Sequence, residues 1–293
     1  MPSHRVTSGL FHRAEAVGAQ LPPLLVAAER VAATVSQGVH GRRRVGPGET
    51  FWQYRRYQPG DSTQRIDWRL SARSRHVFLR QTEWEAAQSV WLWRDASSSM
   101  DYRSRTSWPT KGDRADLLLL ALASLLARGG EHIALLGDDR GPAPGRTALK
   151  RMAASLERGS VSDESLPRPA PLPRFATLVI IGDLLAPLED LAATVAAFAR
   201  QGVSGHILQV LDPAEETLPF AGRVRFLGTE GEGEALIGRV ENVRPAYVAA
   251  MAAHRAGVAR IARAAGWSFA QHHTARPAEA ALLALYLALS IPR

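Results

Sequence analysis

Five side chains that carry hydroxyl or carboxylate oxygens follow three apolar stretches of the sequence, and their types suit a divalent cation. They are Asp95, Ser97, Ser99, Thr147 and Asp183. Mg2+ prefers hard oxygen ligands in octahedral geometry at about 2.0–2.1 Å and usually keeps some bound water. Because only two of the five side chains carry a charge, a bound cation would keep a position open for a partner's carboxylate. The residues therefore predict a metal site that can bind an acidic group of another molecule.

Apolar stretches alternate with helical periodicities from residue 90 to the end of the chain. Strands are expected at 90–93, 132–136, 177–181, 206–211 and 267–270, with a short peripheral strand at 224–227. Helices are expected at 113–128, 147–156 and 188–200, and two more are expected with Pro245 and Pro277 in their first turns. This alternation predicts an α/β fold with a doubly wound, mostly parallel sheet and helices on both faces, preceded by a helix and a short irregular or β segment.

The order of these elements predicts that the oxygen-bearing side chains meet at one edge of the sheet. In a doubly wound sheet, the binding crevice lies beyond the carboxyl ends of the strands. Asp95 and the two serines follow the first expected strand, Thr147 follows the second, and Asp183 follows the third. The simpler interpretation is a capped turn at Asp95, a helix cap at Thr147 and a solvated loop acid at Asp183.

Local signals also place the ends of two expected helices. Asp113 suits the N-cap of helix 113–128, and Gly129 suits its C-terminal stop. Thr147 suits the N-cap of helix 147–156. Since capping and metal binding use the same hydroxyl, both roles of Thr147 are possible in different states.

Residues 1–84 are expected to form a basic segment of their own, and residues 85–293 the α/β domain. A helix is expected at 22–37, and short strands and turns are expected between residues 38 and 82. The aromatic residues of this stretch are expected to form its core: Phe51, Trp52, Tyr54, Tyr57, Trp68 and Phe78.

The net charge of +8 comes entirely from residues 1–82, which contain 13 Arg against 5 acidic residues. Such a segment can bind nucleic acid or an acidic protein. Nucleic acid is the less favoured partner, because a GC-rich genome also produces an Arg-rich composition. A further alternative is an internal salt-bridge network formed by Arg55, Arg65, Asp67 and Arg73.

Composition excludes several classes of protein. The chain has no cysteine, which removes disulfides, thiolate zinc sites and a cysteine nucleophile. No secretory signal is visible, and the apolar run 280–291 is shorter than the roughly 20 residues that a membrane-spanning helix needs. We therefore expect a cytoplasmic protein without a membrane span.

The pattern Asp95-x-Ser97-x-Ser99, with Thr147 and Asp183 on later loops, resembles the metal-ion-dependent adhesion site of von Willebrand factor A domains. The resemblance implies that the two serines and the threonine supply hydroxyl ligands. It also implies that the two aspartates act on the metal directly or through water. The preceding Arg94 departs from the pattern, since this strand is usually apolar in that fold.

Three runs, a Gly-rich one at residues 46–51 and Arg-containing ones at residues 55–61 and 65–73, are similar to the signature of the bacterial family called domain of unknown function 58. The similarity extends over about residues 38–211, and Arg56 stands where many members carry an acid. The family pairs this segment with a von Willebrand factor A-like core. The resemblance implies a non-enzymatic adaptor that acts with a MoxR-type AAA+ ATPase in chaperone-like maturation of a client, or in metal insertion.

Two other functions fit parts of the sequence less well. A nucleic-acid-binding module would use the Arg-rich first segment. A Mg2+-dependent phosphatase would use Asp95 as its nucleophile and would need a second acid two residues later as general acid. Ser97 occupies that position, so the phosphatase hypothesis lacks a required group.

Overall fold

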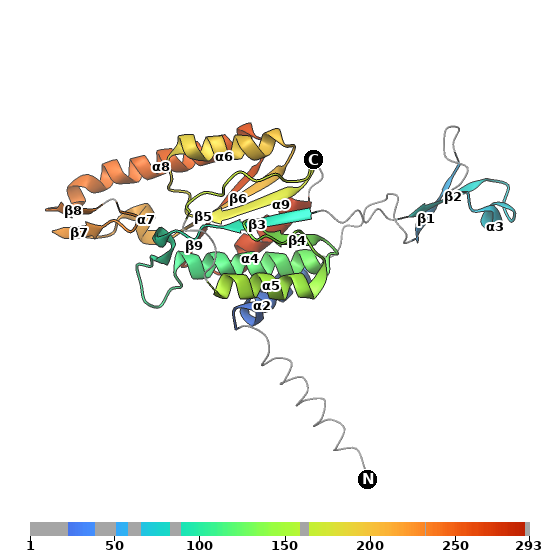
Figure 1. Cartoon of the computed structure of the whole chain (residues 1–293), viewed down its shortest axis with the longest axis horizontal. Helices are drawn as coiled ribbons and strands as arrows, with labels where there is room; N and C mark the ends of the chain where they lie inside the picture. The colour runs from blue at the N-terminus through green and yellow to red at the C-terminus, as the bar shows by residue number, and fades with distance from the viewer. Residues whose placement is uncertain are drawn as a thin grey trace, which may run out of the picture. The chain divides into compact units, whose positions relative to one another are not determined.

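A computed structural model describes residues 23–38, 51–57, 66–82, 89–158, 164–231 and 233–290 (Figure 1). The chain divides into two compact units, residues 1–38 together with 89–293, and residues 39–88. This division differs from the expected boundary after residue 84, because helix α2 (Pro23–Gly38) belongs to the larger unit. Ala28, Ala32 and Val35 of α2 are buried, and the helix packs on α4 and α9.

Five parallel strands form the sheet of the larger unit, in the order β4-β3-β5-β6-β9. The strands are β3 (Ser89–Arg94), β4 (His132–Leu135), β5 (Thr177–Gly182), β6 (Ser204–Leu211) and β9 (Ser268–His273). Every residue of β5 is buried, as expected for a strand covered on both faces. The predicted α/β fold with a mostly parallel sheet is confirmed.

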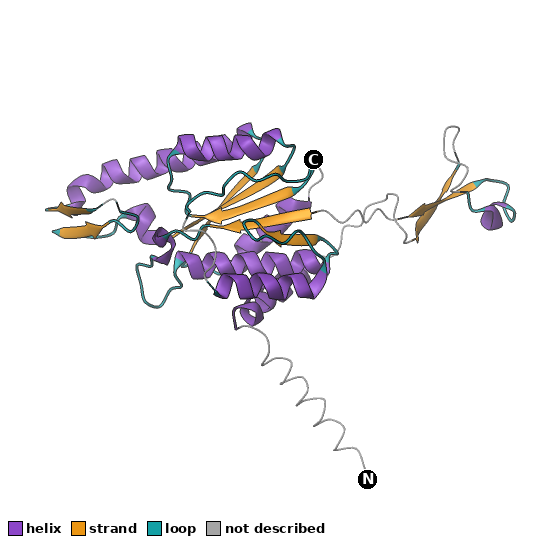
Figure 2. Cartoon of the chain, viewed as in Figure 1, coloured by secondary structure: helices purple, strands orange, loops and turns teal. Residues whose placement is uncertain are grey.

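Helices cover both faces of this sheet (Figure 2). One face carries α6 (Leu188–Arg200) and α8 (Val240–Ala264), and the other carries α4 (Lys111–Arg128), α5 (Gly145–Glu157) and α9 (Ala278–Ser290). Helix α2 packs on the outside of this second layer. The core therefore consists of two apolar layers separated by the sheet.

The core under α6 and α8 follows from the alternation of side chains along each strand. Trp93, Ile180 and Ile207 point to this face and pack with Phe198 of α6. Trp267 enters the same cluster, where its ring lies over a position that only glycine can fill, because a Cβ on Gly205 would lie 1.9 Å from a ring carbon. Packing of this density fixes the sheet against the helices.

The strand order reverses at β3, and this reversal defines where a site can form. The chain leaves β3 through α4 to β4 on one side, and later enters β5 on the other side of β3. The carboxyl ends of β3 and β5 therefore form a topological switch point, where doubly wound sheets bind ligands.

Helix α4 begins with a different N-cap residue from the one expected. The N-cap is Thr110, whose Oγ1 accepts from Asp113 N at 3.0 Å, while Asp113 Oδ2 accepts from Thr110 N at 3.1 Å. Asp113 is thus the third helical residue of a capping box. The expected stop at Gly129 is confirmed, since this residue is the C-cap.

Helix α5 also begins earlier than expected. Its N-cap position is Pro144, which makes no side-chain cap hydrogen bond, and Thr147 lies inside the first turn. The prediction of Thr147 as N-cap is therefore wrong. Proline suits the segment that leads into a helix because it has no N–H to satisfy there.

The C-terminal part of the larger unit has three differences from expectation. Pro245 lies inside α8 and not in its first turn, whereas Pro277 directly precedes α9. The short helix α7 (Pro213–Thr217) and the strand β8 (Glu234–Ile237) were not predicted. Strand β8 pairs antiparallel with the expected strand β7 (Val224–Leu227). The β7–β8 hairpin is separate from the main sheet.

The smaller unit contains an antiparallel pair, β1 (Phe51–Arg56) and β2 (Phe78–Thr82), and the short helix α3 (Trp68–Ser71). The expectation of short strands and turns here is correct. The expected aromatic core is wrong for Trp68 and Tyr54, whose exposed fractions are 65% and 42%. The segment 58–65, with Arg65, lies outside the described residues.

Among the helices of the described ranges, none combines the length and the apolar character needed to cross a membrane.

Candidate metal centre

Asp95 lies at the switch point and is completely buried. Its backbone N–H donates to Ile181 O at 2.8 Å, which extends the pairing between β3 and β5 by one residue. Its carboxylate Oδ1 accepts from both the backbone N and the Oγ of Ser97, at 2.9 and 2.7 Å. The first Asp-x-Ser step is therefore a tight turn with the carboxylate directed into the protein.

A chain of hydrogen bonds through two serine hydroxyls connects this carboxylate to the end of the neighbouring strand. Ser97 Oγ and Ser99 Oγ are 3.0 Å apart, and Ser99 Oγ donates to Asp183 Oδ2 at 2.7 Å. Ser99 belongs to the short 3-10 helix η2 (Ser98–Asp101), while Asp183 directly follows β5. Four of the five predicted side chains thus form one continuous polar cluster.

Gly182 gives Asp95 the space that it occupies. A Cβ on this glycine would lie 2.7 Å from the Cβ and 3.0 Å from Oδ2 of Asp95. Any larger residue at this position must move the aspartate or the end of β5. The glycine before Asp183 is therefore part of the site, although it offers no ligand.

Thr147 is not brought to this cluster. After β4 the chain turns back, and Ala143 forms an antiparallel bridge with Ile133, near the amino end of the strand. Helix α5 begins two residues later, so Thr147 is exposed in its first turn. The neighbouring Arg146 lies 3.6 Å from Glu29 of α2, on the helical layer and away from the carboxyl end of β3.

Lys111 and Glu215 join the cluster, and sequence reasoning missed both. Lys111 is the first residue of α4 and is fully buried. Its Nζ donates to Asp183 Oδ2 at 2.8 Å and to Glu215 Oε1 at 2.5 Å. The available signal was composition, because Lys111 is one of only two lysines among 36 basic residues.

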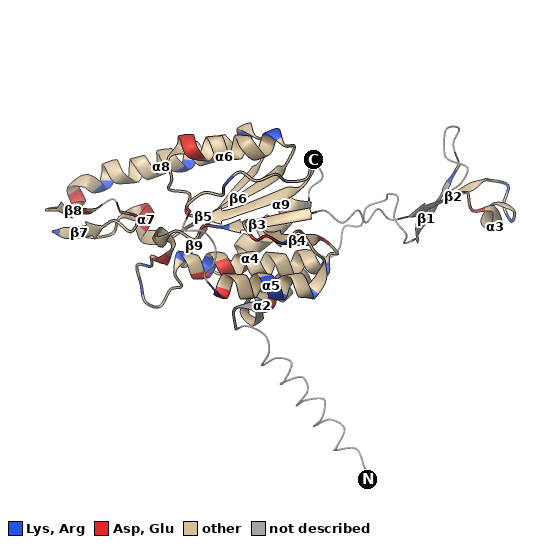
Figure 3. Ribbon diagram, in the orientation of Figure 1, with Lys and Arg blue, Asp and Glu red and all other residues tan. Residues whose placement is uncertain are grey.

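Glu215 is held by the capping box of α7. Its Oε2 accepts from Asp212 N at 2.8 Å, and its backbone carbonyl accepts from Tyr247 Oη at 2.6 Å. Asp212 in turn accepts from Ala214 N and Ser104 N. Figure 3 shows acidic and basic positions together at this end of the sheet.

Burial and neighbouring charges shift the pKa values of the cluster. Burial, followed by the charge of Asp183, raises the pKa of Asp95 to about 7, although the hydrogen bonds from Ser97 act in the opposite direction. Burial acts to lower the pKa of Lys111, but Asp183 and Glu215 raise it above its ordinary value. Burial raises the pKa of Glu215, and the Lys111 ammonium opposes this rise.

The cluster has the features that a small hard cation requires. Asp95 Oδ2 is buried and has no hydrogen-bond partner among the described residues. The distances of 2.7 Å from Asp95 Oδ1 to Ser97 Oγ and of 3.0 Å from Ser97 Oγ to Ser99 Oγ are close to the spacing of about 3 Å between adjacent ligands of an octahedral Mg2+. In the described ranges, no three His, Cys, Asp and Glu side chains group as metal ligands, so hydroxyls and water would complete the shell.

Arg94, the departure from the adhesion-site pattern, is neutralised within the larger unit. Its Nε lies 2.7 Å from Asp116 Oδ1 of α4, and its Nη1 donates to Asp95 O at 3.3 Å. Burial raises the pKa of Asp116 to about 6, although the Arg94 charge opposes the rise. The guanidinium therefore binds the backbone carbonyl of Asp95, while the carboxylate of Asp95 is bound by Ser97.

The sequence over residues 53–257 matches the family described as Protein of unknown function DUF58. The chain belongs to this family. The uncharacterized protein Rv1480 of Mycobacterium tuberculosis is 31% identical to this DUF58 chain over 273 residues, which cover 84% of this chain and 83% of the relative. The uncharacterized protein Mb1516 of Mycobacterium bovis has the same identity and coverage.

Two solved structures resemble this DUF58 chain at 16% sequence identity. An aerotolerance-related membrane protein from Bacteroides fragilis gives a TM-score of 0.42 over 69% of this chain and 98% of that one. The conserved hypothetical protein BatB from Bacteroides thetaiotaomicron gives 0.38 over 70% and 98%.

Proposed function

We propose that this DUF58 chain is a non-enzymatic protein–protein interaction adaptor with a von Willebrand factor A-like core and a metal-ion-dependent adhesion site. Asp95, Ser97 and Ser99 would hold Mg2+ or another divalent cation, and Asp183 would orient Ser99. The open coordination position would accept a carboxylate of a partner. The observation that carries this proposal is the carboxylate of Asp95, whose Oδ1 is bound by the first of two adjacent serine hydroxyls while its buried Oδ2 has no hydrogen-bond partner among the described residues.

The charges of the cluster support a cation. The cluster holds three carboxyl groups and the ammonium of Lys111: the ammonium contacts Asp183 and Glu215, and Asp95 is linked to Asp183 through the two serines. Buried charges require compensation. When all three carboxyl groups are ionised, they exceed the ammonium by two negative charges, which one divalent ion would balance. When bound, the metal would supply a strong positive charge that links the Asp95 carboxylate to a carboxylate of the partner.

Thermal unfolding with excess Mg2+ or with EDTA tests the metal site. A ligand at 100 times its Kd adds about 2.7 kcal/mol, which moves the midpoint of a chain of this size by several degrees. We expect this shift in the wild type and in Thr147→Ala, and expect none in Asp95→Asn. Equal midpoints with Mg2+ and EDTA in the wild type would contradict the proposal. If Mg2+ also raised the unfolding midpoint of Asp95→Asn, the metal would bind at a site that does not include Asp95.

The partner that we propose is a MoxR-type AAA+ ATPase, with an unidentified client that offers a carboxylate. This part rests on the resemblance of the segment 46–73 and on membership of the family. We also propose that the chain acts in the cytoplasm, where ATP is available. Crosslinking followed by co-purification tests it. We expect the ATPase with the wild type and less of it with Asp95→Asn.

The cluster argues against a phosphatase. An aspartyl nucleophile needs a general acid near it, and the residue two positions later, Ser97, donates its hydroxyl to Asp95. A phosphoester assay with Mg2+ should therefore show no turnover that depends on Asp95. Activity that disappears in Asp95→Asn would favour an enzyme over an adaptor.

A second candidate function, nucleic-acid binding, is favoured by one observation. In the smaller unit, Trp68 is 65% exposed, and the neighbouring Arg69 and Arg73 are exposed as well. Aromatic rings beside arginines can stack on bases. Binding of an oligonucleotide that weakens steeply with salt, and that is lost in Trp68→Ala, would support it.

A further inference from the structure

His272, near the end of β9, is only 5% exposed, and its Nε2 has no hydrogen-bond partner among the described residues. Its two neighbours in the strand point to the face that carries α8. Gln271 accepts from Arg255 of α8 at 3.4 Å, and His273 Nε2 lies 2.8 Å from Glu216. Side chains alternate along a strand, so His272 points to the face that carries α4 and α9. Since buried polar groups are normally paired, its Nε2 keeps a hydrogen-bonding capacity that a ligand can use.

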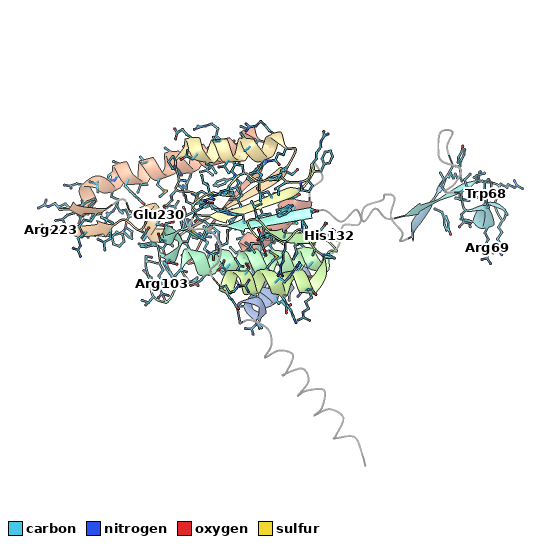
Figure 4. The ribbon with its side chains drawn as sticks, viewed as in Figure 1. Trp68, Arg69, Arg103, His132, Arg223 and Glu230 are labelled. Carbon is cyan, nitrogen blue, oxygen red and sulfur yellow. The ribbon has the colours of Figure 1, made fainter. Side chains whose placement is uncertain are left out.

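Arg114, in the first turn of α4, reaches the same face at the end of β9. Its Nη2 donates to Thr274 O at 3.0 Å, two residues beyond His272, and its Nε is buried without a hydrogen-bond partner among the described residues. In Figure 4 this edge of the sheet is on the side of Arg103, in the loop before α4, and opposite to His132, which begins β4. A guanidinium and an imidazole, each with an unused buried nitrogen, therefore lie at one place.

The first turn of α9 adds backbone N–H groups to this place. Residues 274–277 alone connect β9 to α9, and α9 packs on both β9 and α4. The chain therefore reverses, and the first turn of α9 lies next to the last residues of β9. The first N–H groups of a helix have no partner within it, and the preceding Pro277 has no side-chain group that could cap them. These N–H groups also carry the positive end of the helix dipole.

Positive charge is in excess at this place. Arg276 lies in the exposed turn before α9, and after burial the charges of Arg114 and Arg276 are among the causes that lower the pKa of His272. The acid of this turn of α9 is Glu279, which opposes the lowering of the Arg114 pKa by burial. Asp212, at the end of β6, already accepts from two backbone N–H groups. Two arginines and a protonatable imidazole thus outweigh one carboxyl group, which favours an anion.

We propose that His272, Arg114 and the first turn of α9 form a binding site for a free phosphate ion, with Arg276 at its entrance. The donors come from three elements, β9, α4 and α9, and a tetrahedral oxyanion presents oxygens in several directions at once. A carboxylate has only two oxygens and would leave donors unpaired. Helix N-termini are established places for phosphate. The site does not depend on the proposed metal centre, because none of its groups belongs to that cluster.

Calorimetric titration of the full chain with inorganic phosphate tests the site. The buffer contains EDTA, so that phosphate cannot bind through a metal, and chloride keeps the ionic strength constant. We expect the wild type to bind phosphate more tightly than acetate. His272→Gln and Arg114→Gln should each weaken phosphate binding by about tenfold or more, because hydrogen bonds to charged groups are the strong ones. Arg128→Gln, exposed in the last turn of the same helix α4, is the matched control and should bind as the wild type does.

Arg276→Gln tests the site without touching a buried residue, so the result does not depend on whether the two buried variants fold. We expect phosphate affinity to fall by about threefold, as for an exposed charge, whereas Arg260→Gln, exposed on α8, should leave it unchanged. Phosphate should also shift the imidazole nitrogen NMR signals of His272 in the wild type. A wild type that binds phosphate no more tightly than acetate, or a His272 signal that does not respond to phosphate, would overturn the proposal.

Discussion

The Nζ of Lys111 lies 2.8 Å from Asp183 Oδ2, the same oxygen that accepts the Ser99 hydroxyl. One carboxylate oxygen therefore joins a fully buried ammonium to the serine pair of the candidate metal centre. Because Asp183 Oδ2 already accepts from both groups, the metal site that we propose would use Asp183 to orient Ser99 and not as a direct ligand. The arrangement also places a buried positive charge beside the cluster, so a cation bound as we propose would lie on the side of Asp95.

Replacement of this ammonium by a neutral side chain should be costly. Lys111→Met leaves Asp183 and Glu215 buried without their counter-charge, and breaking a buried ion pair from one side costs about 3–5 kcal/mol. We expect a loss of this size in urea denaturation, partly recovered with excess Mg2+. Lys150→Met is the control, since the other lysine is exposed on α5. Equal stabilities of the two variants would show that the buried pair contributes little.

Gly182→Ala should disturb Asp95 without changing any polar group. The added Cβ would lie 2.7 Å from Asp95 Cβ, and forced displacements of this kind cost about 1–3 kcal/mol. We expect a lower unfolding midpoint and a smaller response to Mg2+. Gly141→Ala, where an added Cβ meets nothing within 4 Å, should retain both. A normal Mg2+ response in Gly182→Ala would mean that the position of Asp95 is not important for the site.

His272 should make the fold less stable in mild acid. Burial, followed by the charges of Arg114 and other neighbours, lowers its pKa from 6.5 to about 4. Because the folded pKa is lower than the unfolded one, the stability from neutral His272 is present above pH 6.5 and is lost as pH falls towards 4. The loss is about 3 kcal/mol at most.

His272→Gln does not titrate, so the difference in unfolding free energy between the wild type and this variant should change between pH 7 and 4. The measurement is urea denaturation at several pH values. His76→Gln, at an exposed position of the smaller unit, serves as control and should follow the wild type. If the difference in unfolding free energy between the wild type and His272→Gln stayed constant from pH 7 to 4, the lowered pKa of His272 would not be the cause of the loss of stability in acid.

The two threonines at the starts of α4 and α5 should respond differently to truncation. Thr110→Ala removes the cap hydrogen bond to Asp113 N and should cost about 1 kcal/mol. Thr147→Ala should change stability by less than about 0.5 kcal/mol, because this side chain is exposed and is not the N-cap of α5. A larger loss in Thr147→Ala than in Thr110→Ala would contradict the helix starts described above.

Much of the fold could be predicted because its signals are local. Helix α6 and strand β7 have the expected bounds, and the other expected strands and helices of the larger unit before residue 240 differ by one or two residues at either end. The apolar runs of β3 and β5 are unbroken until the polar residues that form the site. The errors occur where the signal is weak or ambiguous, as at Pro245, which the long helix α8 accommodates in its interior.

The sequence by itself determined the parallel sheet and the convergence of Asp95, Ser97, Ser99 and Asp183. Asp95, Ser97 and Ser99 follow one strand, and Asp183 follows the neighbouring strand. Because the carboxyl ends of parallel strands lie at the same edge of a sheet, these side chains must lie close together. Only the tertiary structure decided the remainder. The bridge between Ile133 and Ala143 keeps Thr147 away, and packing adds Lys111 and Glu215, which lie 104 residues apart along the chain. No local pattern encodes such contacts, because they depend on how separate elements close around a buried charge.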